Sequence, residues 1–302
     1  MPNIPDFPEF RPVCLTDREY LEGLLRVLQP ELSELTYTNL FMFRHVHDYQ
    51  LSAMDGGVAI LAYSYSGKPY FMPPIDCRDP KKAVDSFFDY LRGMGDEPVI
   101  ELASQGFVDE HIAGRPGYTF SADRDNADYV YNTSDLITLA GRKFHDKKNL
   151  LNRFLKAYPG HEYRWLTPDL LPQAKDLVER WCQEKCSIEI PSTLGETEAT
   201  LLALSHMDRL GYTGGAVLID GKVEAISLGE ELNRETVVVH VEKANAEFAG
   251  LYQYISGEFL RREFPDHRFV NREQDLGEPN LRKSKLSYNP VRMVEKYTIK
   301  PA

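Results

Sequence analysis

The sequence is poor in cysteine and has no long apolar run. Only four cysteines occur in 302 residues, namely Cys14, Cys77, Cys182 and Cys186, and they form no C-x-x-C pair, so we expect no disulfide framework. Cys182 and Cys186 lie one helical turn apart, but no second ligand pair with the spacing of a zinc site follows. We therefore expect half-buried thiols on a helix and no metal.

Targeting and membrane-spanning features are missing as well. The first ten residues contain neither a basic segment nor an apolar core, and their prolines interrupt any helix, so no signal peptide is expected. No apolar run approaches the roughly 20 residues that a membrane-spanning helix needs. These absences predict a soluble, cytoplasmic protein with reduced thiols and no transmembrane segment.

An excess of positive charge is also absent. Lys and Arg number 35 against 46 Asp and Glu, which gives a net charge of −11 and a pI near 5.3. Binding to nucleic acid or to an anionic membrane would therefore depend on local basic clusters. With 42% hydrophobic residues and about twice the length of a typical domain, the chain is expected to fold around a sizeable core, most simply as two domains.

The order of predicted elements is similar in the two halves of the chain. The first half is predicted to begin with a helix from Asp17, capped by Thr16 and Glu19, and a helical stretch to about Arg44. Hairpins over 49–75 follow, with turns at Gly56-Gly57 and Ser66-Gly67. The rest of this half is predicted to contain a helix from Pro80, a strand over 98–103, a short helix over 105–113 and extended structure over 118–139. The second half is predicted to contain helices over 168–185 and 196–210, a hairpin over 214–228 that turns at Asp220-Gly221, a strand over 236–243, a helix over 246–264, a strand over 268–272, a helix from Pro279 and a strand over 292–299. We predict two similar α/β domains with mixed sheets, residues 1–135 and 136–302; one irregular α+β domain is the alternative.

Positive charge gathers in two clusters. Residues 141–156 hold six basic residues and one acid on a predicted amphipathic helix: Arg142, Lys143, Lys147, Lys148, Arg153 and Lys156 against Asp146. Its cationic face could bind phosphates, an RNA backbone or lipid headgroups, or could be ordinary solvated surface. The second cluster lies over residues 280–300 and sets six cations against one acid: Arg282, Lys283, Lys285, Arg292, Lys296 and Lys300 against Glu295. Its first three cations follow the start of the helix at Pro279, which suits a phosphate or carboxylate unless the cluster is plain surface charge.

Titratable side chains interrupt two of the predicted strands. His240 and Glu242 alternate with valines over 236–243, so we expect both on one face, where a histidine beside a carboxylate can act as a general base; the wet face of an edge strand is the alternative. Asn271, Glu273 and Asp275 follow the strand over 268–272. If this strand lies beside the first, the acids could bind an ammonium group or accept a proton, although Asp275 could also form only a turn with Gly277.

Three segments resemble one known family. Residues 141–154, 240–254 and 270–290 are similar to the phosphatidylglycerol lysyltransferase C-terminal domain family. The resemblance spans most of the chain and implies two tandem GNAT-like N-acyltransferase folds, similar to the Fem-type aminoacyltransferases that use aminoacyl-tRNA. It implies transfer of an aminoacyl group to an amine or hydroxyl of a small molecule, peptide or lipid headgroup, with the active site in residues 136–302.

The resemblance also implies roles for the residues above. Glu242 or His240 would take the acceptor proton, Tyr288 would give a proton to the leaving hydroxyl, and Glu273 with Asp275 would recognise an ammonium group. Lys243 or Arg282 would stabilise an oxyanion or a phosphate. Further substrate contacts are expected from Asn245, Asn271, Lys283 and Lys285, and contacts with tRNA or another anionic ligand from Arg142, Lys143, Lys147, Lys148 and Arg153.

Two other functions fit the same residues. Members of the GNAT group that use acetyl-CoA resemble Gln/Arg-x-x-Gly-x-Gly/Ala at the start of the helix after the fourth strand, whereas residues 243–250 contain one glycine and an acid. This difference disfavours acetyl-CoA, so aminoacyl-tRNA is the expected donor and acyl-CoA the alternative. A CoA-dependent N-acetyltransferase and a non-catalytic ligand- or RNA-binding protein with this fold therefore remain as alternatives.

Overall fold

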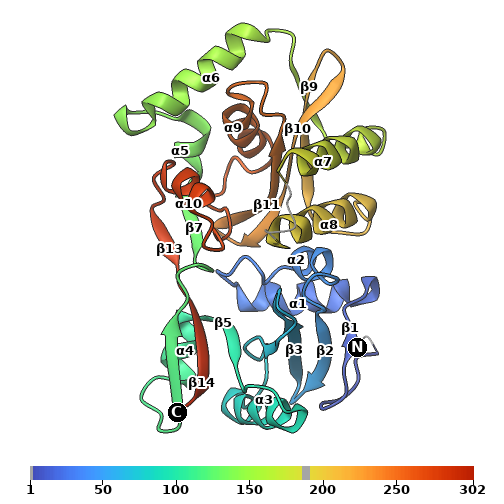
Figure 1. The fold of residues 1–302 in the computed structure, drawn as a ribbon, viewed down its shortest axis with the longest axis vertical. Coiled ribbons are helices and arrows are strands. Elements are labelled where there is room, and N and C mark those ends of the chain that lie inside the picture. Colours follow the sequence, from blue (N-terminus) through green and yellow to red (C-terminus); the bar gives the residue numbers. More distant parts are fainter. Residues whose placement is uncertain (1–2, 186–190) are drawn as a thin grey trace. The chain divides into compact units, whose positions relative to one another are not determined.

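The chain forms two compact units, each built on a seven-stranded mixed sheet (Figure 1). The computed structural model describes residues 3–185 and 191–302. Unit 1 comprises Met1–Asp128 and Val294–Ala302, and unit 2 comprises Tyr129–Met293. The division differs from the predicted one near Asp135 because the strand after Asp128 pairs within the second sheet, whereas the last strand of the chain returns to the first sheet.

Unit 1 has a sheet in the order β1-β2-β3-β4-β5-β14-β6. Its strands are β1 (Arg11–Pro12), β2 (Gln50–Met54), β3 (Gly57–Tyr63), β4 (Pro69–Phe71), β5 (Ile100–Ser104), β6 (Tyr118–Ala122) and β14 (Lys296–Pro301). Its helices are the 3-10 turn η1 (Leu15–Asp17), α1 (Arg18–Leu28), α2 (Tyr37–Met42), α3 (Pro80–Met94) and α4 (Gln105–His111). The predicted strand over 292–299 is wrong in one respect, since it divides into β14 and a separate strand of the second sheet.

Local sequence signals explain the ends of several elements in unit 1. Asp55 and Gly56 both have positive φ and form the β2–β3 turn, one residue earlier than predicted. Gly57 follows in β3, where a Cβ would lie 2.0 Å from the carbonyl oxygen of Ile75, so no side chain fits. The start of η1 also differs from the prediction, because the Asp17 carboxylate, rather than Thr16, accepts the local backbone bond, from the N–H of Cys14.

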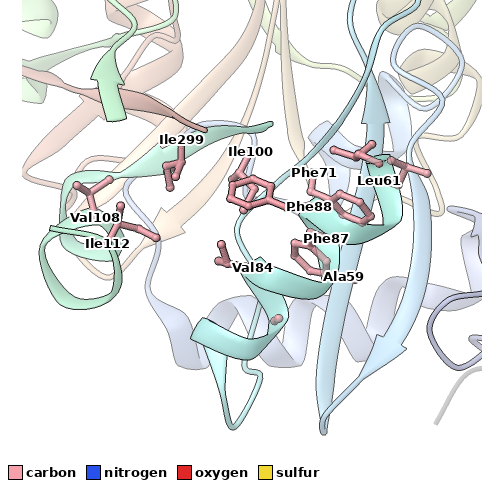
Figure 2. Packing of buried hydrophobic residues seen from close by; sticks show 13 residues of the cluster. Ala59, Leu61, Phe71, Val84, Phe87, Phe88, Ile100, Val108, Ile112 and Ile299 are labelled. Atoms are coloured by element: carbon pink, nitrogen blue, oxygen red, sulfur yellow. The ribbon is translucent and has the colours of Figure 1, made fainter. Parts of the chain in front are cut away.

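The core of unit 1 lies between the sheet and the helices α3 and α4 (Figure 2). The rings of Phe71 on β4 and Phe87 on α3 stack with their centroids 4.1 Å apart. Ile100 on β5 and Ile299 on β14 are fully buried in the same cluster. The C-terminal strand therefore contributes apolar surface to the core of the N-terminal unit, and burial of such side chains is the main source of its stability.

A buried group of charges fastens β14 inside unit 1. The Lys296 ammonium lies 2.6 Å from a Glu34 oxygen and 2.7 Å from an Asp128 oxygen, and all three side chains are buried. Ser33 donates to Asp128 from its backbone N–H and from its hydroxyl, at 2.9 and 3.0 Å. Burial lowers the pKa of Lys296, but Asp128 and Glu34 outweigh burial and raise it. Burial also raises the pKa of Glu34 to about 7, against the opposing effect of Lys296.

Replacing Lys296 tests how far unit 1 depends on this group. In K296M, two buried carboxylates lose their cation, so we expect the free energy of unfolding to fall by about 3 kcal/mol or more. Lys300 on the same strand pairs with Glu97 at the surface, so K300M is the matched control and should keep the wild-type value. Urea denaturation measures both, and equal midpoints for the two variants would contradict the assignment.

The raised pKa of Glu34 predicts a pH dependence of stability. An exposed glutamate titrates near pH 4.3, so folding raises the proton affinity of Glu34. The stabilisation from its proton is complete at low pH and is lost as pH rises through about 7, which corresponds to about 1 kcal/mol between pH 6 and 8.5. The E34Q variant should lack this decline when urea midpoints are compared at the two pH values, and an unchanged decline would exclude Glu34 as its source.

Unit 2 has a sheet in the order β13-β7-β12-β11-β10-β9-β8. Its strands are β7 (Asp128–Asn132), β8 (Glu162–Trp165), β9 (Thr213–Ile219), β10 (Lys222–Asn233), β11 (Thr236–Ala244), β12 (Phe269–Asn271) and β13 (Arg292–Val294). Its helices are α5 (Thr133–Thr138), the 3-10 turn η2 (Arg142–Phe144), α6 (His145–Ala157), α7 (Leu171–Lys185), α8 (Pro191–Ser205), α9 (Leu251–Glu263) and α10 (Pro279–Leu286). The helix α5 replaces part of the extended structure predicted over 118–139, β8 was not predicted, and the Asp220-Gly221 hairpin is confirmed.

The helix α9 packs on one face of the second sheet, with α7 and α8 on the other (Figure 1). Phe259 of α9 lies over Gly215 of β9 and Gly229 of β10, where a Cβ would come within 2.9 and 3.1 Å of its ring. Gly250 at the start of α9 has φ +95, and a Cβ there would lie 2.1 Å from the carbonyl oxygen of Leu150 on α6. Both contacts bring backbone close to its neighbour, which only glycine permits.

A β-bulge interrupts β11 at His240. Leu228 of β10 pairs with Val241, but the next residue, Gly229, pairs with Val239, so His240 is the extra residue on its strand. The bulge changes the alternation that a regular strand would have. Glu242 then lies on the side of the sheet where Val239 packs, next to α9, and the prediction of a single face for His240 and Glu242 is wrong.

The structure also bears on two predictions from the sequence, the reduced state of the cysteines and the lack of a transmembrane helix. Cys14 and Cys77 are free thiols, whereas Cys182 is disulfide-bonded, which corrects the expectation that all thiols are reduced. Cys186 lies outside the described residues. Among the residues that the structure describes, no helix is both long enough and apolar enough to span a bilayer.

Candidate functional site

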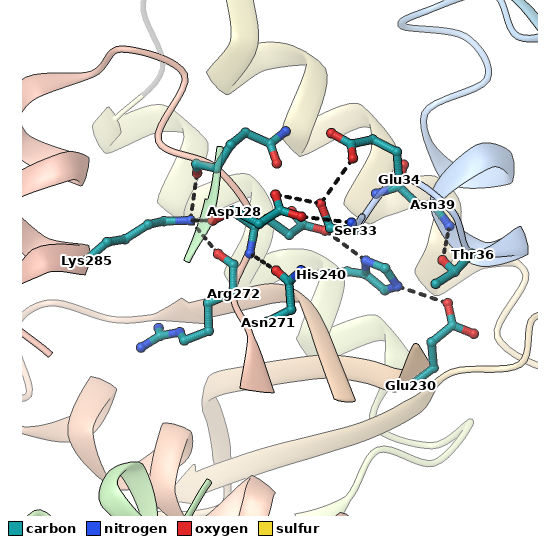
Figure 3. A network of polar contacts seen from close by, with 12 residues as sticks. Ser33, Glu34, Thr36, Asn39, Asp128, Glu230, His240, Asn271, Arg272 and Lys285 are labelled. Carbon is teal, nitrogen blue, oxygen red and sulfur yellow. Dashed lines mark hydrogen bonds and ion pairs between the residues drawn. The ribbon is translucent and has the colours of Figure 1, made fainter. Parts of the chain in front are cut away.

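His240 lies between two carboxylates that come from two other elements of unit 2 (Figure 3). Its Nδ1 is 2.9 Å from Glu273 Oε1, and its Nε2 is 2.9 Å from Glu230 Oε1. Glu230 belongs to β10, and Glu273 follows β12. The parallel pairing of β11 with β12 was the condition for His240 and Glu273 to meet, and that pairing is present.

The two carboxylates determine the charge of His240. Burial lowers the pKa of this histidine, but the hydrogen bonds to Glu230 and Glu273 outweigh burial and raise the pKa to about 9. At neutral pH the ring is therefore an imidazolium, which has no lone pair to accept a proton. A role as general base, one of two predicted for the pair His240 and Glu242, does not suit His240 in this state.

Glu242 forms a second group with Arg272 and Tyr288 on the α9 side of the sheet. An Arg272 guanidinium nitrogen lies 2.8 Å from Glu242 Oε1. The same guanidinium lies 5.3 Å from the centre of the Tyr288 ring, and Gln253 of α9 donates to the Tyr288 hydroxyl at 2.8 Å. Burial raises the pKa of Tyr288, so its hydroxyl keeps its proton at neutral pH. The predicted acid and base of the reaction thus share one neighbourhood, with a cation between them.

Lys147 connects the basic helix α6 to this second group. Its ammonium lies 4.4 Å from the centre of the Tyr288 ring, a cation–π contact. Burial and the nearby Arg272 lower the pKa of Lys147. The other basic residues of this stretch lie elsewhere: Lys143 pairs with Asp135, Lys148 donates to the Thr138 carbonyl, and Arg142 and Arg153 are exposed.

Lys243 lies apart from Glu242, because consecutive residues of β11 point to opposite sides of the sheet. Its ammonium is 2.7 Å from Glu196 of α8 and 3.3 Å from the centre of the Trp181 ring of α7. Burial lowers its pKa, and Glu196 opposes the change. Asn245 also serves local structure, since its amide donates to Glu224 and its oxygen accepts from the N–H of Glu247.

Asp275 is fully buried and is occupied by protein partners. Arg282 binds both of its oxygens, at 2.9 and 2.7 Å, and the Tyr129 hydroxyl and the Gly277 N–H also donate to it. Burial tends to raise the pKa of Asp275, but these donors outweigh burial and hold the pKa well below its usual range. The arrangement agrees with the alternative that Asp275 shapes the turn at Gly277, and it removes Arg282 from an exposed anion site.

Lys285 and Asn271 hold the segment that carries Glu273 (Figure 3). The Lys285 ammonium donates to the backbone carbonyls of Arg272, Glu273 and Gln274. The Asn271 side chain accepts from the Glu273 N–H at 2.8 Å. Glu273 itself has φ +57, a conformation that L residues adopt rarely and that these bonds support. Lys283, by contrast, is exposed on α10.

Sequence reasoning missed four residues of these groups. Glu230 accepts from His240, Arg272 pairs with Glu242, and Glu196 and Trp181 surround Lys243. Arg272 stands inside the Asn271–Glu273 segment, so its position offered a signal. The other three come from elements whose packing against β11 no local pattern reveals.

A surface hollow of about 490 Å³ lies elsewhere in unit 2. Its lining residues are Asn132, Thr133, Ser134, Ile137, Thr138, Pro265, His267 and Arg268. None of the predicted site residues is among them, so this hollow does not help to locate the chemistry.

The fold is that of a known class of two-sheet proteins. FemX, a solved structure, superposes with a TM-score of 0.56 at 8% identity over 97% of each chain. The C-terminal domain of a putative lysylphosphatidylglycerol synthetase from Agrobacterium fabrum gives a TM-score of 0.64 at 12% identity, covering 95% of this chain and 92% of that one. These likenesses confirm the predicted mixed α/β fold of the tandem GNAT and Fem type.

Residues 25–300 match the family described as phosphatidylglycerol lysyltransferase, C-terminal, and the chain belongs to that family. A conserved protein of unknown function from Bacteroides thetaiotaomicron is 32% identical, with a TM-score of 0.88 over 97% of this chain and 99% of that one. An uncharacterized protein of Mycoplasmoides gallisepticum is 24% identical over 177 residues. That match spans 58% of this chain and about half, 56%, of the curated relative. Family and fold support a transferase of the acyltransferase type.

Replacing Asp275 separates a structural role from a ligand-binding one. In D275N, the buried Arg282 contact loses its counter-charge, so we expect a loss of about 2–4 kcal/mol in the free energy of unfolding. Because the pKa of Asp275 is depressed in the folded protein, its contribution is present above the pKa of an unfolded aspartate and decreases as pH falls below it. An unfolded aspartate titrates near pH 3.9, so urea midpoints at pH 7 and about 3 should differ less for D275N than for the wild type.

The exposed Asp266 provides the control for that measurement, and D266N should behave as the wild type does. A D275N variant with wild-type stability would contradict the structural role and would return Asp275 to the residues available for substrate.

Proposed function

We propose that the protein transfers an aminoacyl group from aminoacyl-tRNA to an amine or hydroxyl acceptor, at a site in residues 136–302. The observation that carries the proposal is the group of Glu242, Arg272 and Tyr288, which places a carboxylate, a cation and a protonated phenol around one location. An acyl transfer needs a proton acceptor, a partner for the developing oxyanion and a proton donor for the leaving group.

In the proposed reaction the acceptor nitrogen or oxygen attacks the carbonyl carbon of the aminoacyl ester. Glu242 takes the proton that the acceptor loses, and Arg272 faces the negative charge that develops on the carbonyl oxygen. When the ester C–O bond breaks, Tyr288 gives its proton to the departing ribose oxygen, and the proton held by Glu242 restores the phenol. Glu273 recognises an ammonium group of the transferred amino acid.

The basic helix supports tRNA as the source of the donor. Arg142 and Arg153 are exposed, and Lys147 of α6 lies against the ring of Tyr288, so α6 could hold a phosphate backbone beside the reacting group. Such a role needs no base recognition, because phosphate contacts position a nucleic acid without reading its sequence.

The start of α9 argues against acetyl-CoA as the donor. Pyrophosphate binding at such a helix needs backbone N–H groups that a ligand can approach closely. At Gly250, the space that the missing side chain leaves is occupied by the carbonyl of Leu150, and Asn245 binds the nearby Glu247 N–H. The glycine thus serves the packing of α6 on α9.

Incubation with charged tRNAs, CoA thioesters and candidate acceptors, followed by mass spectrometry of the products, tests the proposal. In E242Q the proton acceptor is lost, so aminoacyl transfer should fall by roughly 10²-fold or more while the thermal unfolding profile stays cooperative. The exposed Glu247 gives the matched control, and E247Q should transfer at the wild-type rate.

Two outcomes would replace the proposal. Turnover with acetyl-CoA and none with charged tRNA would assign the protein as a CoA-dependent N-acetyltransferase. A protein that binds tRNA, loses that binding in a salt-dependent way after R142E and R153E, and transfers nothing would be a non-catalytic RNA-binding protein.

A further inference from the structure

We infer that His240 is a positioning residue: as an imidazolium it holds the Glu230 and Glu273 carboxylates in place for an ammonium group of the donor, and it takes no proton itself. The inference deepens the proposed function and rests on it for the identity of the ligand. It adds Glu230 to the residues that recognise the donor and gives His240 a role other than catalysis.

The geometry alone requires an additional proton in this group. A neutral imidazole has one N–H, so it can donate to one carboxylate and must present a lone pair to the other. Both ring nitrogens of His240 lie 2.9 Å from a carboxylate oxygen, and ionised carboxylates only accept hydrogen bonds. With both nitrogens protonated, each contact becomes a charge-assisted hydrogen bond. The raised pKa of His240 agrees with this assignment.

Two separate features of the fold bring the group together. The bulge in β11 places His240 out of the regular pairing with β10, toward the strand position that Glu230 occupies opposite Val238. Lys285 and Asn271 hold Glu273 in its left-handed conformation. Side chains fixed in this way lose little entropy when a ligand binds, which is a property of binding sites.

Exposure distinguishes the carboxylates from the histidine. The His240 ring is fully buried, whereas the Glu230 and Glu273 side chains keep 12% and 16% of their surface exposed. A ligand can therefore reach the carboxylates but not the imidazolium. Two carboxylates and one imidazolium carry a net charge of about −1, so the group favours a cation. A primary ammonium, with three donors, suits carboxylate oxygens, which only accept hydrogen bonds.

Two aminoacyl analogues test this inference by calorimetry: glycinamide, which carries only an α-ammonium, and lysinamide, which also carries a side-chain ammonium. We expect E230Q and H240Q each to weaken binding of at least one analogue by about tenfold or more, as for a lost charge-assisted hydrogen bond. An effect on both analogues identifies the α-ammonium as the ligand, and an effect on lysinamide alone identifies the side-chain ammonium.

The neighbouring pair of Glu231 and His267 provides the matched controls. These side chains are 3.5 Å apart and belong to the same unit, but they lie outside the group. E231Q and H267Q should bind both analogues within twofold of the wild-type affinity. Because E230Q and H240Q act on one group, the double variant should lose little more affinity than the single variant that binds the analogue more weakly.

The ¹⁵N NMR signals of His240 report its protonation independently of any activity or of how H240Q folds. Both ring nitrogens should show the protonated shifts from pH 6 to 8, and E230Q should shift the titration to lower pH. A neutral ring at pH 7 would overturn the inference, as would wild-type protein that binds neither analogue.

Kinetics separate the two roles of a histidine. A positioning role predicts that H240Q raises KM for the donor more than it lowers kcat and keeps the pH profile of kcat. A collapse of kcat with unchanged KM and a lost limb of that profile would make His240 the base and overturn the inference. If the wild type binds the analogues but transfers nothing from tRNA, the proposed reaction fails while the assignment of the ammonium-binding group stands.

Discussion

The parallel pairing of β11 with β12 is the constraint on which the candidate site depends. Because the two strands run in the same direction, the residues that follow Asn271 arrive beside the second half of β11, where His240 and Glu242 lie. Arg272 and Glu273 are consecutive residues with different partners: Arg272 contacts Glu242, and Glu273 contacts His240 at the bulge. One register thus produces two separate groups, a carboxylate–guanidinium–phenol group and a carboxylate–imidazolium–carboxylate group.

Burial of charge is managed in the same way in both units. The side chains of Lys296 and His240 are fully buried and that of Arg272 is 18% exposed, and each lies within hydrogen-bond distance of at least one carboxylate. A buried charge without such a partner would cost several kcal/mol, so the partners cannot be exchanged one at a time. The two groups differ in solvent exposure, however. The side chains around Lys296 are buried, whereas those of Glu230 and Glu273 beside His240 keep some surface exposed.

The family and the site together limit what the chain can do. Membership of the lysyltransferase family supports transfer chemistry, but the groups that would perform it are defined by contacts within unit 2. Asp275 and Arg282 show why a list of charged residues is insufficient, since each neutralises the other inside the fold. Lys285 supports backbone carbonyls instead of an anion. Glu230 and Glu273 keep part of their surface exposed, so a substrate can reach them.

The sequence by itself determined the order of most helices and strands, the Asp220-Gly221 hairpin and the segments that carry the site, because turn residues and apolar periodicity are local properties. It also indicated that Glu273 would lie near the strand that carries His240 if the two strands were neighbours. Only the tertiary structure decided that β14 joins the first sheet, that a bulge separates His240 from Glu242, and that Glu230 completes the histidine's contacts. These features depend on which strands become neighbours over long sequence separations, and no local pattern of residues encodes that choice.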